Sequence, residues 1–226
     1  MKVLAAGIRI SHCTPKHVLG LCLLNAAVFP PTDKDGGARL PPWKLPGHIM
    51  SNCKSLRQRL ELNHVMVATK PGRVVGSVEV HTPAYLRAQA PTLTEEQASL
   101  LQPYLCSMAV REDMRGCGIG RALVEAVVAE AEAAAPPGQL MLLQVEANNT
   151  AAVALYEACG FSTISHPWCQ LAVMRKRLRE PDEGLADGLA GAGAGAGAAP
   201  VKPQGLDGDL GSSAAGPDGD TEECGT

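Results

Sequence analysis

Aromatic side chains are scarce in this chain: they make up 3% of its 226 residues, whereas hydrophobic residues as a whole make up 46%. A chain of this length and composition can bury one sizeable core. Because aromatics are few, we expect that core to consist mainly of Leu, Val, Ala and Met. The sequence has no apolar run near the ~20 residues that a membrane-spanning helix requires, so no membrane partner is expected.

Cysteine pairs of the Cys-x-x-Cys type are also missing, although the chain has eight cysteines. Their irregular spacing matches no zinc motif, so no metal is expected. Cys106, Cys117, Cys159 and Cys169 fall inside expected elements, which favours buried thiols in a reducing compartment. The first ten residues are too short and too strand-like for a secretory signal. We therefore expect a cytoplasmic protein, and the sequence leaves a plastid or nuclear location open.

Basic residues almost vanish after Arg179. Residues 180–226 contain ten of the 23 acidic residues of the chain and one of its 20 basic residues, Lys202. This Gly/Ala-rich segment has no aromatics and too little apolar surface to fold, so we expect a domain over 1–179 and a disordered tail over 180–226. The remaining 19 basic and 13 acidic residues give the domain a positive charge that suits a ligand with several phosphates. No basic cluster with interleaved aromatics indicates nucleic acid.

A glycine-rich turn stands at the centre of the chain. It follows an apolar run, 105–110, that predicts a buried strand, and it precedes an apolar repeat of four-residue spacing that predicts a helix as far as Pro136. The turn residues are Arg115, Gly116, Cys117, Gly118, Ile119 and Gly120. Glycines let a ligand approach the backbone, and the first turn of a helix presents free N–H groups, so the pattern predicts an anion site.

Two common kinds of phosphate-binding turn are excluded by residues that this turn lacks. The lysine-containing nucleotide loop needs Gly-Lys-Ser/Thr, which is absent. The dinucleotide fingerprint needs a third glycine at the position of Arg121. The remaining pattern is Arg-x-x-Gly-x-Gly, which by itself can be only a turn between a strand and a helix.

A second strand and helix follow the first pair. The run 141–145 predicts a strand, Asn149 is a plausible N-cap, and Gly160 ends the helix. The pattern reads Asn149, Ala152, Leu155, Tyr156, Gly160 and Phe161. Together with the glycine turn, in this order and at this spacing, it resembles the GNAT acetyltransferase superfamily. The resemblance is specific over 104–161 and looser elsewhere.

The order of expected elements agrees with that resemblance. Strands are predicted over 2–10, 64–69, 73–80, 105–110, 141–145 and 168–174, and helices over 14–28, from beyond Pro46 to Leu62, after Thr94, over 119–135 and over 149–159. Lys70-Pro71-Gly72 predicts a hairpin turn. This is an α/β fold; the resemblance implies a mixed, mostly antiparallel central sheet flanked by helices.

The resemblance implies acetyl-CoA as the cofactor and assigns residues to it. The glycine turn and Arg121 would hold its pyrophosphate. The backbone of Met108, Ala109 and Val110 would hold the pantetheine arm, and Asn149 its amides. Tyr156 matches the tyrosine of the family that protonates the departing thiolate.

The proton acceptor for the attacking amine is left open. Bacterial ribosomal-protein N-terminal acetyltransferases have a glutamate at the position of Gln144, which cannot act as a base. Tyr104 occupies the position of a catalytic tyrosine in some eukaryotic N-terminal acetyltransferases. Glu79 and His81 are further alternatives, although a histidine at a strand end is more often only a loop residue.

The acceptor is less visible than the cofactor. Phe29 and Pro30 resemble the start of the acceptor loop in N-terminal acetyltransferases. We therefore expect an N-acetyltransferase, monomeric or homodimeric, that acts by direct attack on protein N-terminal or lysine amines. Two alternatives are an enzyme for small amines, such as arylalkylamines or polyamines, and a non-catalytic acyl-CoA-binding module, which the missing glutamate at Gln144 motivates.

Overall fold

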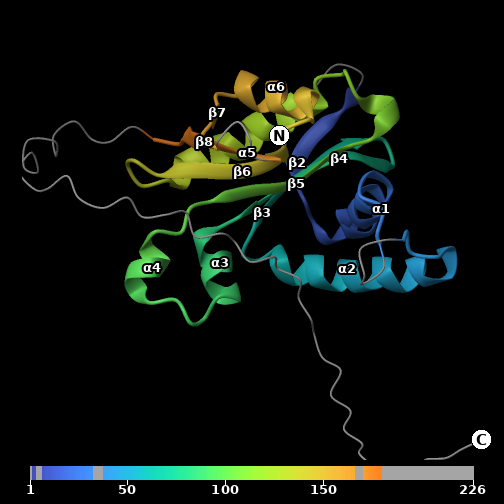
Figure 1. Ribbon diagram of the computed structural model, residues 1–226. Coiled ribbons are helices and arrows are strands. Elements are labelled where there is room, and N and C mark those ends of the chain that lie inside the picture. Colours follow the sequence, from blue (N-terminus) through green and yellow to red (C-terminus); the bar gives the residue numbers. More distant parts are fainter. Residues whose placement is uncertain (1, 4–6, 33–37, 166–169, 180–226) are drawn as a thin grey trace, which may run out of the picture. The chain divides into compact units, whose positions relative to one another are not determined.

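Eight strands form one mixed sheet in the computed structural model, which describes residues 2–3, 7–32, 38–165 and 170–179 (Figure 1). They are β1 (Lys2–Val3), β2 (Arg9–His12), β3 (His64–Lys70), β4 (Arg73–His81), β5 (Tyr104–Val110), β6 (Leu140–Glu146), β7 (Ser162–Thr163) and β8 (Leu171–Arg177). Their order across the sheet is β1-β2-β3-β4-β5-β6-β8-β7. Every neighbouring pair is antiparallel except β5 and β6. The predicted α/β fold with a mostly antiparallel sheet is confirmed.

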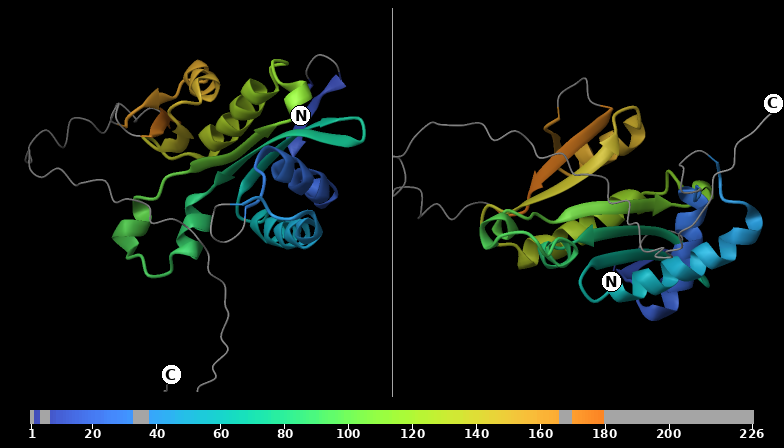
Figure 2. Two further views of the ribbon diagram at one scale, coloured as in Figure 1. Left: turned by 45° about the vertical axis from the view of Figure 1, so that its right-hand side comes forward. Right: turned by 60° about the horizontal axis from the view of Figure 1, so that its bottom comes forward.

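Two pairs of helices cover the two faces of the sheet (Figures 1 and 2). The helices are α1 (Val18–Val28), α2 (Leu45–Arg59), α3 (Pro83–Gln89), α4 (Glu95–Ser99), α5 (Ile119–Ala134) and α6 (Thr150–Ala158). Helices α1 and α2 pack on one face, and α5 and α6 pack on the other. In the ranges that the structure describes, no helix is both long enough and apolar enough to cross a membrane.

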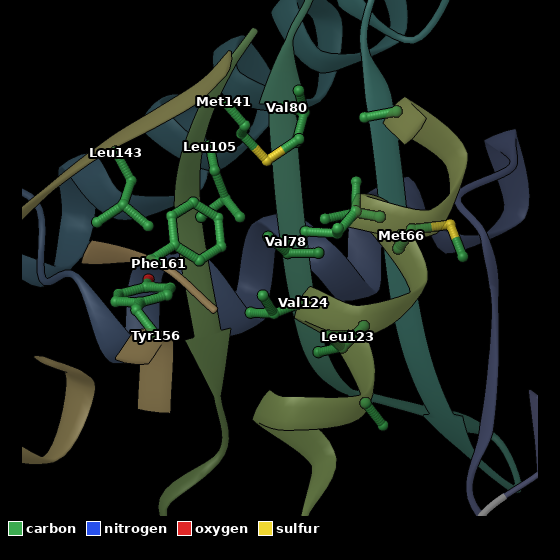
Figure 3. Packing of buried hydrophobic residues seen from close by; sticks show 14 of the residues in the cluster. Met66, Val78, Val80, Leu105, Leu123, Val124, Met141, Leu143, Tyr156 and Phe161 are labelled. Carbon is green, nitrogen blue, oxygen red and sulfur yellow. The ribbon is translucent and has the colours of Figure 1, made fainter. Parts of the chain in front are cut away.

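The core is aliphatic, as the scarcity of aromatics predicts. On the α1/α2 face, Val18, Leu21 and Leu56 pack against the sheet. On the α5/α6 face, side chains such as Leu123 and Met141 are fully buried (Figure 3). Each such side chain contributes roughly 1.5–3 kcal/mol by its removal from water.

The helices predicted over 14–28 and after Thr94 both begin with capping contacts. Thr14 and Pro15 open a 3₁₀ turn that leads into α1, and the ring of His17 accepts from the Thr14 N–H at 3.1 Å. At α4, the Gln97 N–H donates to Thr94 Oγ1 at 3.2 Å, and the Thr94 N–H donates back to Gln97 Oε1 at 3.0 Å. Both predicted entries are therefore confirmed.

Three predictions about elements are wrong. The single strand over 2–10 is a hairpin, because β1 pairs antiparallel with β2, and Gly7 in the turn has a φ of 71°. The segment 81–103 contains two short helices rather than one, since Thr82 caps α3 by accepting from the Tyr85 N–H. Helix α2 begins at Leu45, because Pro46 fits the first turn of a helix, where no N–H is needed.

Some predicted segments lie outside the described residues. These are residues 4–6 of the first predicted strand, residues 168–169 of the last one, and the tail, 180–226. The described part of the last strand, β8, extends to Arg177, beyond the predicted end at residue 174.

Candidate active site

Strands β5 and β6 separate after two paired residues, and this opening is the central feature of the site. Tyr104 faces Leu142 and Leu105 faces Leu143, and the parallel register of these two strands ends there. The strands separate where β5 contains a β-bulge. Ser77 of β4 pairs with Ala109, but Glu79, two residues on, pairs with Cys106, three residues back along β5. Ser107, in the bulge, has a φ of 49°. Among the described residues, no strand thus pairs with the β6-facing backbone edge of Met108, Ala109 and Val110.

The glycine turn lies at the end of β5. Gly116 and Gly118 have φ values of 75° and 74°, a left-handed conformation that favours glycine. Helix α5 begins directly after it, at Ile119. The first N–H groups of an α-helix have no partner within the helix, so those of the first turn of α5 are available to an anion, together with the positive end of the helix dipole.

Gly120 has a different role from the two turn glycines. A Cβ atom at this position would lie 3.0 Å from Met108 Cε and 3.2 Å from Leu155 Cδ2. The missing side chain therefore lets α5 approach β5 and α6 closely. This contact brings the two family-like patterns of the sequence together around the opening.

Arg115 and Arg121, in and directly after the glycine turn, are exposed, and each donates a hydrogen bond within the protein. The Arg121 Nε group donates to Glu125 Oε1 at 2.8 Å, one helical turn further along α5. The Arg115 Nε group donates to the Val110 carbonyl oxygen at 3.4 Å. Both guanidinium groups add positive charge beside the turn, which suits a pyrophosphate.

Tyr156, on α6, is buried on the α5/α6 side of the opening. Its ring meets Phe161 edge to face, in a cluster that includes Leu105 and Leu143 (Figure 3). Burial, followed by the neighbouring Cys106, Cys159 and Tyr104, raises the pKa of Tyr156 to about 12. The hydroxyl group therefore stays protonated at neutral pH and can donate a proton.

Asn149 caps α6, as predicted. Its Oδ1 atom accepts from the Ala152 N–H at 3.2 Å. An amide oxygen can accept two hydrogen bonds and the Nδ2 group can donate, so both ends of the Asn149 amide can contact a cofactor. The proposed binding of pantetheine amides by Asn149 stays a prediction.

Tyr104 and Gln144 lie on the opposite side of the opening from Tyr156. Leu105 and Leu143 belong to the α5/α6 core, so their strand neighbours Tyr104 and Gln144 point to the other face. The Tyr104 hydroxyl group donates to Gln144 Oε1 at 3.4 Å. Burial, followed by the effect of Cys106, raises the pKa of Tyr104.

Glu79 is a buried carboxylate on the same face, with only 4% of its surface exposed. The Asn63 Nδ2 group donates to its Oε1 atom at 2.8 Å, and Arg59 Nε lies 3.7 Å from the same oxygen. His81 Nε2 lies 3.4 Å away from it. Burial by itself would raise the pKa of Glu79, but His81, Arg59 and Asn63 outweigh it, so the pKa is lowered. Glu79 is therefore ionised but too enclosed to meet a substrate directly.

Sequence reasoning missed Arg59 and Asn63. No local pattern reveals them, because the fold alone brings the end of α2 beside β4. One signal was present for Glu79: an acidic residue that alternates with valines in a predicted strand must be compensated if it is buried.

One group of side chains could be considered for a metal ion. In the described part of the chain, only Glu79, His81 and Cys106 qualify, with ligand atoms that all lie within 4.8 Å of one another. Arg59 already compensates the charge of Glu79, and a second cation beside it would be repelled. Burial, followed by the Glu79 charge, raises the pKa of Cys106 to about 12, so its thiol is neutral. The group fits a metal ion poorly.

The loop that was predicted to bind the acceptor contains exposed apolar surface. Phe29 follows α1 directly, and its side chain is 51% exposed. Helices α3 and α4 lie between β4 and β5 in the chain, at the end of the sheet where β4 ends and β5 begins (Figure 1). An open groove of about 1730 Å³ lies between α1, the β3–β4 turn and residues 111–115, which lead into the glycine turn. Its walls include Val28, the residue before Phe29, but neither Tyr104 nor Tyr156.

Comparison with solved structures supports this fold. A ribosomal-protein-alanine N-acetyltransferase from Brucella melitensis is 23% identical, with a TM-score of 0.54 over 75% of this chain and 99% of the other. The ribosomal-protein-S18-alanine N-acetyltransferase from Escherichia coli is 18% identical, with a TM-score of 0.52 over 79% and 98%. The putative acetyltransferase yncA from Salmonella typhimurium, determined with its cofactor acetyl-CoA, is 18% identical, with a TM-score of 0.54 over 78% and 98%.

Comparison with curated protein sequences finds no match. At these identities the structural likeness establishes the fold alone. The family model described as Acetyltransferase (GNAT) family, however, matches residues 38–161, more than half of the chain. The protein therefore belongs to the GNAT acetyltransferase family and is a GNAT-type N-acetyltransferase.

Proposed function

We propose that this enzyme transfers an acetyl group from acetyl-CoA to the N-terminal amine of a protein, by direct attack in a ternary complex. The observation that carries the proposal is the opening between β5 and β6. It has an anion-binding turn at one end, a buried proton donor on one side, and a polar, partly exposed surface on the other. Two of the structures with this fold are named as acetyltransferases of alanine on ribosomal proteins, which supports a protein N-terminus as the acceptor.

The cofactor is proposed to lie along the opening. Its pyrophosphate would accept hydrogen bonds from the N–H groups of residues 116–121. Its pantetheine arm would pair with the β6-facing backbone edge of Met108, Ala109 and Val110. The same N–H groups can stabilise the negative charge that develops on the thioester oxygen.

The chemistry then needs no covalent enzyme intermediate. The amine nitrogen attacks the thioester carbonyl carbon, the C–S bond breaks, and the Tyr156 hydroxyl group donates a proton to the departing sulfur. Cys106 lies directly after the two residues of β5 that pair with β6, and its high pKa makes it a poor nucleophile at neutral pH. Direct attack by the amine is therefore favoured over transfer through Cys106.

The surroundings of the site favour a peptide over a polyamine. A polyamine would need an acidic cleft, but the Glu79 carboxylate is buried and faces Arg59. Phe29 and Pro30 provide an exposed apolar loop that suits the first residues of a peptide. This apolar surface gives less reason to expect a lysine side chain or a small aromatic amine as the acceptor.

A non-catalytic acyl-CoA-binding module is the second candidate, because Gln144 cannot act as a base. Release of free CoA thiol, measured with a library of peptides of varied first residue, lysine peptides and small amines, decides between the candidates. Turnover that depends on a free peptide N-terminus supports the proposal. Tight acetyl-CoA binding without thiol release for any acceptor would contradict it and support the binding module.

A further inference from the structure

A buried ionic chain connects α2 to the end of β4. Arg59, the last residue of α2, lies 3.7 Å from Glu79 Oε1, and His81 Nε2 lies 3.4 Å from the same atom. Asn63 Nδ2 donates to this oxygen at 2.8 Å. All three contacts converge on one carboxylate oxygen. Of the three, Asn63 makes a hydrogen bond, whereas Arg59 and His81 lie at ion-pair distances, so the anion is compensated and Nε2 of His81 faces it.

His81 lies next to the opening between β5 and β6. It faces Tyr104 across the β4–β5 pair, and Tyr104 belongs to the first of the two rungs that join β5 to β6. One of its ring nitrogens lies within 4.8 Å of Cys106 Sγ, on the first residue after those rungs. The ring also stacks on Tyr85 of α3, with centroids 4.7 Å apart. Its side chain retains 18% exposure, whereas that of Glu79 retains 5%.

We propose that His81 is the proton acceptor for the attacking amine and that Glu79 is its positioning residue. This inference rests on the proposed function. Nε2 faces Glu79, so the incoming proton is taken by Nδ1, directly or through one water. Glu79 orients the ring and stabilises the imidazolium ion that forms, while Arg59 and Asn63 keep Glu79 ionised and in place.

The other polar groups around the opening are less suited to this role. Gln144 has no basic atom. Tyr104 would have to be ionised, and its raised pKa opposes that. The groups near His81 that carry charge or can titrate are Glu79, Arg59, Cys106, Tyr85 and Tyr104. A neutral imidazole, by contrast, carries one basic nitrogen that can accept a proton.

Each proton that moves in the reaction has a donor and an acceptor. The ammonium form of the acceptor gives one proton to His81 Nδ1, and the freed lone pair attacks the thioester carbonyl carbon. The C–S bond breaks, and its electron pair leaves with the sulfur, which takes a proton from Tyr156. The new amide nitrogen loses its second proton to solvent as Tyr156 is reprotonated, and His81 releases its proton to solvent before the next turnover.

The test compares His81→Gln and Glu79→Gln with a matched control, His64→Gln. His64 also lies beside a carboxylate, with its Nδ1 atom 3.7 Å from Glu130 Oε2, but this pair is on the α5 side of the sheet. For each variant, kcat and KM are measured with the best peptide between about pH 5 and 8, where imidazole titrates. Acetyl-CoA affinity is measured by calorimetry.

We expect His81→Gln to lower kcat by about 10²-fold. It should also abolish the acid limb of the pH profile, which is the fall in kcat towards low pH. Acetyl-CoA affinity should be unchanged. Glu79→Gln should move that limb to lower pH, because the imidazolium ion loses its counter-anion. His64→Gln should match the wild type in rate and profile. A purely structural role for His81 would lower kcat without removing the limb.

Full turnover with an intact acid limb in folded His81→Gln would overturn the inference and leave the proposed function standing. Absence of turnover in the wild type would instead overturn the proposed function itself. If Glu79→Gln does not fold, His81→Ala supplied with free imidazole replaces it. Recovery of turnover with imidazole supports the role of His81, and absence of recovery argues against it.

Discussion

The rings of Tyr156 and Phe161 pack edge to face, with centroids 5.9 Å apart. This contact uses the edge and face of the two rings and not the Tyr156 hydroxyl group. Packing and proton donation by Tyr156 can therefore be separated by removal of one oxygen atom.

Tyr156→Phe should lower kcat by about 10²-fold, since the departing thiolate loses its proton donor. Acetyl-CoA affinity and melting temperature should change little, because the ring remains packed. Steady-state kinetics and calorimetry measure the two effects. Full activity across the pH range would mean that Tyr156 is only structural.

Gly118→Asp should weaken acetyl-CoA binding, and Gly118→Asn is its matched control. Both side chains tolerate the left-handed φ of 74° about equally, and a Cβ at this position meets nothing within 4 Å. The variants therefore differ mainly in charge. A carboxylate beside the pyrophosphate should cost about 1 kcal/mol or more relative to Asn, which is tenfold in affinity for each 1.4 kcal/mol. Equal affinities by calorimetry would argue against the anion-binding turn.

Changes at Tyr104 and Gln144 test the acceptor side. Tyr104→Phe and Gln144→Ala should each lower turnover less than His81→Gln does, because a protonated phenol and an amide supply no base. Gln144→Glu should raise turnover near neutral pH. In a His81→Gln background it should restore part of the lost rate, because a carboxylate then offers a proton acceptor across the opening. No recovery in the double variant would indicate that a carboxylate at position 144 cannot reach the amine.

The stability of the protein should depend on pH through Glu79. Its folded-state pKa is lowered relative to the unfolded chain. Its contribution is therefore fully present above the ordinary carboxyl range, near pH 4.5, and is lost as pH falls through the folded value. Urea unfolding of wild type and Glu79→Gln should differ by about 1–3 kcal/mol at pH 7. The difference should shrink in acid, and a constant difference would show that the carboxylate charge is not the cause.

Truncation after Arg179 should leave melting temperature and acetyl-CoA affinity nearly unchanged. The removed segment, 180–226, has a composition that provides no apolar surface for a core. Thermal denaturation and calorimetry of the shortened chain measure this. A large fall in melting temperature would show that the segment contributes to the folded domain.

The sequence by itself determined the elements whose causes are local. The caps at Thr14, Thr94 and Asn149, the glycine turn and the amphipathic α5 all depend on residues within a few positions of one another. Helix periodicity and capping chemistry can therefore be recognised from the sequence. The family resemblance rests on the same kind of information, since it comes from two short patterns in order.

Only the tertiary structure decided how those elements form a site. The opening between β5 and β6 depends on a bulge at Ser107 and on a strand pairing between residues about 40 positions apart, and no local pattern encodes it. Two partners of Glu79, Arg59 and Asn63, likewise come from a distant segment, the end of α2 and the residues after it. The early hairpin at Gly7 was missed for the same reason, because an apolar run looks alike whether it continues or turns back. Local rules act along the chain, whereas charge compensation and strand separation depend on which distant segments meet.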